Sequence, residues 1–246
     1  MSFRKVGSVV TFGLLVAGIA PAALAQDPVC GNGVTEVFEQ CDGADSTACA
    51  AGCLPNCFCA PLCSPSPIVG CRKAFAGAGT LKIVRDFRSN SPVTTLDWTW
   101  QHGDATTKND FANPTSTAGP FYAFCVYDGS PGLQPRVDST ISPGVTPWKE
   151  STQYFKYLDP NSTRSNEAVL SHGIKQVKLT PGAPGKASIL VQARAPFFSP
   201  PVLPLSLPVV VQLQRVERGG SSPICWEVEY TTPTRNDDLQ FVSRGP

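Results

Sequence analysis

The chain has 246 residues with 20 basic and 19 acidic side chains, so it lacks the excess of positive charge that nucleic-acid-binding proteins show. Its 24 prolines, single methionine and 16% of charged residues predict an extended, turn-rich β protein rather than a helical one.

The first residues have the order of a secretory signal peptide. Arg4 and Lys5 precede an apolar stretch from Val9 to Ala20, and Ala23-Leu24-Ala25 offers the small residues that signal peptidase needs. The alternative, a membrane anchor, would need about 20 apolar residues, and this stretch is shorter. We therefore predict a signal peptide at residues 1–25, no transmembrane anchor, and a protein that is secreted or lies in the periplasm or at the cell surface.

Charge is unevenly distributed after that leader. Without it the chain has 18 basic and 19 acidic residues, a net charge of −1, so no nucleic-acid partner is expected. Residues 26–63 carry a net charge of −5, whereas residues 64–246 carry +4. The two regions could attract each other or recruit different partners, or both charge sets could simply be solvated surface.

Ten cysteines in an exported chain predict disulfides rather than zinc ligands. Eight of them fall in residues 26–71, which hold few large apolar residues and would need cross-links to fold. We predict a disulfide-rich module there, with Cys63 bridging Cys71, and a separate Cys125–Cys225 bridge. The cysteines are Cys30, Cys41, Cys49, Cys53, Cys57, Cys59, Cys63, Cys71, Cys125 and Cys225.

The segment from Cys30 to Gly43 reads CGNGVTEVFEQCDG. It resembles the myxococcal-type cysteine-rich repeat of large secreted and cell-surface bacterial proteins, in one copy of about 30 residues. That resemblance implies an extracellular disulfide module and no enzymatic activity. The region that follows also resembles uncharacterised secreted proteins of deltaproteobacteria that carry this module.

The same segment offers a candidate calcium site. Asn32, Glu36, Glu39 and Asp42 bear the hard oxygen atoms that calcium prefers. The alternative is that these side chains face solvent or cap turns, and the scarcity of acidic residues after Asp42 favours it. No other cofactor is expected.

Residues 72–246 show short apolar runs between turn residues, which predict a β-sandwich domain. Similar segments recur in the same order, which suggests an internal duplication. The predicted strands are Thr80–Arg85, Leu96–Gln101, Tyr122–Tyr127, Tyr154–Leu158, Lys175–Leu179, Ala187–Ala193, Val209–Val216 and Cys225–Tyr230.

Hydrolase chemistry has few candidates in this region. Neither His102 nor His172 lies in a metal-binding or nucleophile motif. Asp97, Asp104 and Asp110 could pair as glycosidase carboxylates, but sequence does not give their separation.

Aromatic side chains suggest a binding surface instead. Trp98 and Trp100 share one face of a strand, and Trp148 could extend a platform on which sugars stack. The alternative is that these tryptophans fill the core of the sandwich. The proline-rich segment Ala195–Pro208 should be an extended connection or an edge, packed over the sandwich or open to a partner.

These patterns together favour a secreted, non-enzymatic protein for adhesion, binding or envelope structure. Its partner would be an unknown protein or glycan at the cell surface. The alternative is a secreted hydrolase acting on carbohydrate.

Overall fold

A computed structural model describes residues 30–33, 41–42, 53, 62–88, 93–129, 131–145, 147–159, 173–195, 199–217 and 224–245. The predicted signal peptide and most of the predicted module lie outside these residues. In the described part the chain is mainly β, with two sheets stacked as in a sandwich, which confirms the predicted fold class. Nothing in the arrangement tests the duplication, which stays a prediction.

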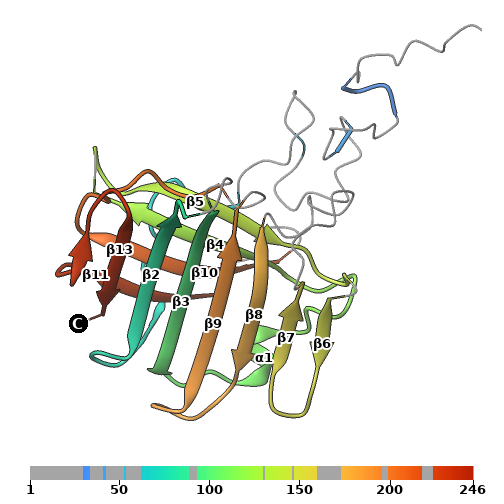
Figure 1. Ribbon diagram of the computed structural model, residues 1–246. Helices are drawn as coiled ribbons and strands as arrows, with labels where there is room; N and C mark the ends of the chain where they lie inside the picture. The colour runs from blue at the N-terminus through green and yellow to red at the C-terminus, as the bar shows by residue number, and fades with distance from the viewer. Residues whose placement is uncertain are drawn as a thin grey trace, which may run out of the picture.

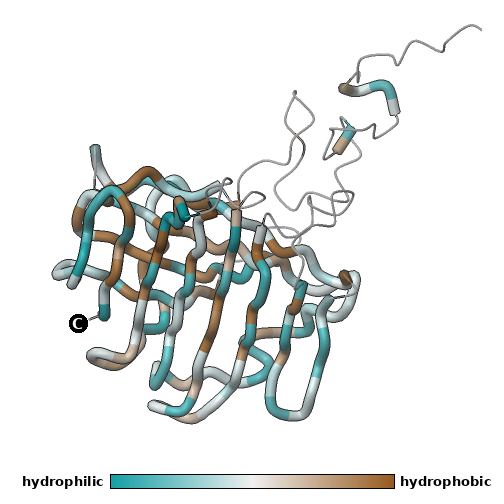
Figure 2. The backbone as a smooth tube through the Cα atoms, in the orientation of Figure 1, coloured by the Kyte–Doolittle hydropathy of each residue, from teal (hydrophilic) through white to brown (hydrophobic). Residues whose placement is uncertain are grey.

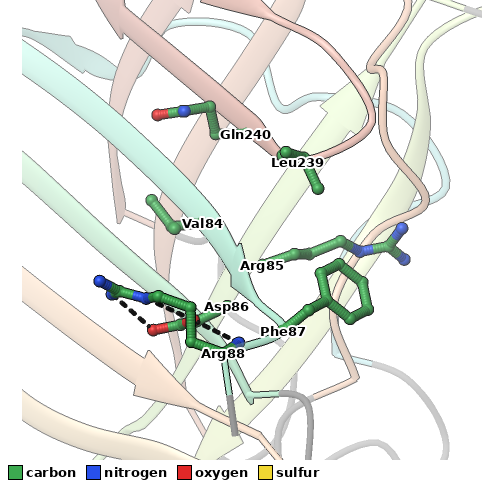
Figure 3. A pocket seen from close by; sticks show the side chains of 7 residues that line it. All are labelled: Val84, Arg85, Asp86, Phe87, Arg88, Leu239 and Gln240. Atoms are coloured by element: carbon green, nitrogen blue, oxygen red, sulfur yellow. Dashed lines mark hydrogen bonds and ion pairs between the residues drawn. The ribbon is translucent and has the colours of Figure 1, made fainter.

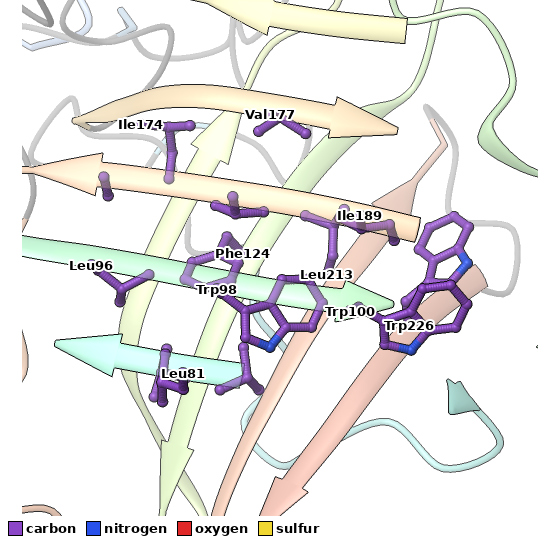
Figure 4. Close-up of a cluster of buried hydrophobic side chains, with 14 of the residues drawn as sticks. Leu81, Leu96, Trp98, Trp100, Phe124, Ile174, Val177, Ile189, Leu213 and Trp226 are labelled. Atoms are coloured by element: carbon purple, nitrogen blue, oxygen red, sulfur yellow. The ribbon is translucent and has the colours of Figure 1, made fainter. Parts of the chain in front are cut away.

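The two sheets differ in size, and their strands cross at a steep angle (Figures 1 and 4). The five-stranded sheet has the order β1 (Arg72–Lys73), β11 (Ile224–Tyr230), β10 (Val209–Val216), β4 (Phe121–Asp128) and β5 (Gln134–Ile141). The eight-stranded sheet has the order β12 (Arg235–Asn236), β13 (Gln240–Arg244), β2 (Gly79–Asp86), β3 (Val93–Gly103), β9 (Ala187–Arg194), β8 (Ile174–Thr180), β7 (Phe155–Leu158) and β6 (Trp148–Glu150). β1 pairs with β11 in parallel, and the other pairs are antiparallel.

All eight predicted strands are strands in the structure. The sequence patterns did not predict β5, whose outward side chains are polar, or the short strands β1, β6, β12 and β13. It also missed α1 (Lys108–Phe111), a single helical turn that a capping box between Thr107 and Asp110 begins. Phe111 at its end is buried and stacks on Trp226, with ring centroids 4.8 Å apart.

One continuous core lies between the sheets (Figure 4). Burial alternates along β2, β3 and β9, as expected of strands with one face on a core and one toward solvent. The glycine at the end of β3 is required by this packing, because a Cβ at Gly103 would lie 2.1 Å from the Trp100 ring.

The five-stranded sheet is covered on both faces. All eight residues of β4 are buried, although only alternate ones face the core. On the outer face, Leu62 and Cys63 pack against Ala123 and Cys125. Residues 62–71, here called the covering segment, therefore cover part of the outer face of this sheet.

Two disulfides fix the covering segment, and they differ from the predicted pairing. Cys63 joins Cys125 with a Cα–Cα distance of 5.7 Å, and Cys71 joins Cys225 at 4.7 Å. The predicted Cys63–Cys71 and Cys125–Cys225 bridges are both wrong. Because β10 lies between β4 and β11, Cys125 and Cys225 are two strand spacings apart, about 10 Å, and a disulfide spans at most about 7 Å.

The proline-rich connection behaves as predicted where it is described. Residues 199–208 form no strand and carry the chain from β9 in one sheet to β10 in the other. Leu203 and Leu205 are buried in the core, whereas Val202 is 78% exposed.

Candidate functional site

The predicted calcium site is described only in part. The Asp42 carboxylate accepts hydrogen bonds from the backbone N–H groups of three consecutive residues, Gly31, Asn32 (3.1 Å) and Gly33. Asp42 is therefore a turn cap that closes the loop between Cys30 and Cys41, and Cys41 is bonded to Cys53. The described residues contain no group of three or more His, Cys, Asp or Glu that could hold a metal. Glu36 and Glu39 lie outside them, so calcium binding stays a prediction.

The predicted aromatic platform is wrong. Trp98 and Trp100 do share one face of β3, but that face is the core, and neither is exposed to solvent. Trp148 is also buried, and its indole N–H donates to the Ser142 carbonyl at 3.0 Å. Core packing, the alternative reading of these residues, is what the structure shows.

The carboxylates considered for hydrolysis each have a structural partner. Asp97 accepts a hydrogen bond from the Gln192 amide at 2.6 Å, and Asp104 accepts one from the Lys73 backbone N–H at 2.8 Å. Asp110 caps α1 and pairs with Arg72 at 3.0 Å.

Burial pushes the pKa of Asp110 upward, but the hydrogen bonds from Thr107 and the ion pair with Arg72 outweigh it and hold the pKa below its usual value. His102 is exposed at the irregular end of β3, and His172 lies outside the described residues. None of these groups is brought to another in a catalytic arrangement within the part of the chain that is described.

An open groove of about 420 Å³ lies where the end of β2 meets the start of β13 (Figure 3). The Arg85 backbone N–H donates to the Leu239 carbonyl at 2.8 Å and fixes the two segments side by side. Phe87 is 56% exposed and Leu239 is 47% exposed, so two large apolar side chains of this groove meet solvent. Its lining comes from Val84, Arg85, Asp86, Phe87, Arg88, Leu239 and Gln240.

A bidentate ion pair lies at the same groove. The Arg88 guanidinium donates to both carboxylate oxygens of Asp86, at 3.0 and 2.8 Å (Figure 3). These hydrogen bonds, with that from the Arg88 backbone N–H, lower the pKa of Asp86 to about 2. The groove thus combines apolar side chains with an exposed pair of opposite charges, a mixture of apolar and polar groups that small-ligand sites commonly have.

Sequence reasoning did not find this groove, because its two sides lie about 150 residues apart in the chain. The only local signal was a large apolar residue, Phe87 or Leu239, among charged neighbours at a strand end.

A second polar cluster lies beneath the covering segment. Gln212 is fully buried, and its amide donates to the Ile68 carbonyl at 2.8 Å and accepts from the Ile68 N–H at 3.0 Å. It also donates to Glu227 at 2.6 Å, and the Gln214 amide donates to it at 2.8 Å.

The Tyr127 hydroxyl belongs to the same cluster. It donates to the Ser64 carbonyl at 3.0 Å and accepts from Gln214 at 2.9 Å. Burial and the nearby negative charge of Asp138 and Glu227 raise the pKa of Tyr127 to about 12, although the Gln214 hydrogen bond opposes the shift. These side chains serve to bind the chain's own backbone, so we assign the cluster a structural role.

Comparison with known proteins gave no match: no protein-family model, no curated protein and no solved structure is similar to this chain. The resemblance of the segment from Cys30 to Gly43 to the myxococcal repeat therefore stays a prediction. Location has firmer support, because the three described disulfides indicate an oxidising, extracytoplasmic compartment. In the part of the chain that the structure describes, no helix is long and apolar enough to cross a membrane.

Proposed function

We propose that this is a secreted, non-enzymatic binding protein that attaches to a protein or glycan at the cell surface. The observation that carries the proposal is the groove between β2 and β13, where exposed Phe87 and Leu239 lie beside the Asp86–Arg88 ion pair. Exposed aromatic and aliphatic side chains lose unfavourable contact with water when a ligand covers them.

The groove also offers polar groups that can orient a ligand. Asp86 and Arg88 are hydrogen-bonded to each other, and the Arg88 side chain is 91% exposed, so a ligand would meet a solvent-accessible pair of opposite charges beside two apolar side chains. The Phe87 ring can stack on the apolar face of a sugar or on an apolar side chain of a protein.

The test is an array of glycans and envelope components probed with the mature chain, its disulfides intact. A double variant, Phe87→Ser with Leu239→Ser, should weaken binding by about tenfold or more, since two apolar side chains leave the contact. The matched control replaces two exposed apolar residues elsewhere, Val69→Ser with Val202→Ser. Equal losses in both double variants, or no ligand on the array, would refute the proposal.

The alternative of a secreted hydrolase acting on carbohydrate has no observation in its favour among the described residues. Hydrolysis of any glycan that the array identifies would revive it.

A further inference from the structure

Three lysines face one another across neighbouring strands of the eight-stranded sheet. Lys149 on β6 lies directly opposite Lys156 on β7, which lies directly opposite Lys178 on β8. Most residues that alternate with these lysines along the strands are buried in the core, so the three lysine side chains share the outer face. The buried residues are Trp148, Phe155, Tyr157, Val177 and Leu179. We call them the lysine row.

Like charges directly opposite each other destabilise a sheet. Strands lie about 4.8 Å apart, so the row sets three ammonium groups along roughly 10 Å. One of them is held in position, because Lys178 Nζ lies 4.8 Å from the centre of the Tyr154 ring.

No acidic side chain faces outward from β6, β7, β8 or β9 in the residues that the structure describes. The neighbouring outward positions are uncharged or basic: Leu158, Gln176, Thr180, Ser188, Leu190, Gln192 and Arg194. Glu150 follows Lys149 in the chain but is already paired with Lys108, at 2.6 Å. Figure 2 shows hydrophilic residues on β6 and β7 at this edge of the sheet.

Edge protection explains only part of this arrangement. A lysine on an edge strand prevents pairing with other chains, and Lys149 on β6 fits that role. Lys156 and Lys178 lie on strands that already have a partner on each side, so they have no edge to protect.

We infer that the lysine row binds an anionic polysaccharide, whose carboxylate or sulfate groups lie along the row and across the strands. This inference goes beyond the proposed function, because the lysine row on β6, β7 and β8 lies toward the other edge of the sheet from the groove between β2 and β13. An extended acidic glycan repeats its negative groups along its length, so a chain that lies across the strands can bring more than one of them to the row. A protein partner would need an apolar centre to its contact, and the row offers only Leu158 and Leu190 beside it.

The test uses the mature chain with polygalacturonate and heparin as probes and neutral dextran as the uncharged control. The wild type should bind both acidic polymers, bind dextran undetectably, and lose affinity as salt rises. The triple variant Lys149→Gln, Lys156→Gln, Lys178→Gln should bind about tenfold more weakly.

A matched triple, Lys82→Gln, Lys175→Gln, Lys186→Gln, removes the same charge from other positions and should bind within about twofold of the wild type. The row variant should also melt no lower than the wild type, because it removes repulsion. That measurement separates lost binding from lost folding.

Equal losses in the two triples, or binding of the wild type to phosphatidylglycerol vesicles but to neither polysaccharide, would overturn this inference. If the groove variants lose an array ligand while the lysine variants keep it, the proposed function stands and only the lysine row fails. If the wild type binds nothing on the array and neither polymer, both fail.

Discussion

The replacement Gln212→Leu tests how the covering segment is held. Leucine has nearly the same size as glutamine but no polar atoms. The change would leave the Ile68 N–H and C=O, one oxygen of Glu227 and one donor of Gln214 without their present partner. The covering segment cannot dissociate from the sheet so that water satisfies these groups, because disulfides hold it at Cys63 and Cys71.

A buried polar group without a partner costs about 1–3 kcal/mol. Glu227 keeps its contact with Lys73, and Gln214 keeps Tyr127, so the main loss falls on the two backbone groups of Ile68. We therefore expect Gln212→Leu to lower the free energy of unfolding by about 3 kcal/mol.

Urea unfolding of the mature chain with its disulfides intact measures this effect. A loss of about 3 kcal/mol corresponds to a midpoint lower by roughly 1–1.5 M urea if the slope is unchanged. The control is Gln192→Leu, which removes a hydrogen bond to Asp97 on the solvent-facing side of β9 and should cost less than about 1 kcal/mol. Equal costs for the two variants would show that Ile68 is not held by Gln212. Hydrogen exchange at the Ile68 amide should quicken in the first variant alone.

Four further outcomes are expected. A non-reducing peptide map should show the Cys63–Cys125 and Cys71–Cys225 bridges, and a Cys125–Cys225 bridge would contradict the fold. Burial raises the pKa of Tyr127 to about 12, so the folded state resists ionisation of this hydroxyl. The stability that the protein has below pH 10 should therefore fall as the pH rises toward 12. Denaturation midpoints measured across this range should fall less in the Tyr127→Phe variant. Gly103→Ala should cost about 2 kcal/mol or more in urea unfolding, since the new methyl group would meet the Trp100 ring; a neutral effect would show that the ring can move. Acrylamide should quench tryptophan fluorescence poorly, since all four tryptophans are buried, and strong quenching would contradict that core.

The strands were predictable because their apolar residues are close together in the sequence. Eight runs rich in Val, Ile, Leu and aromatics became strands, and β10 has the predicted bounds. β5, at an edge of its sheet, was not predicted because Pro135, Arg136 and Asp138 interrupt its apolar pattern.

Features that depend on sheet order were not predictable. Because β10 lies between β4 and β11, Cys125 cannot reach Cys225, and no local pattern in the sequence reports that strand order. The lysine row likewise exists only through the register of three strands, since Lys149, Lys156 and Lys178 show no common motif. The platform prediction failed because two tryptophans on one strand face look alike whether that face meets solvent or core.

The Cys71–Cys225 bond also determines how the protein responds to mechanical force. If a cell-surface attachment pulled on the two ends of the chain, tension would run along the covering segment, cross from Cys71 to Cys225, and continue to the C-terminus. Residues 72–224 lie inside the closed covalent loop and would be spared that tension. The lysine row and the β2 side of the groove therefore lie off the covalent path of the force.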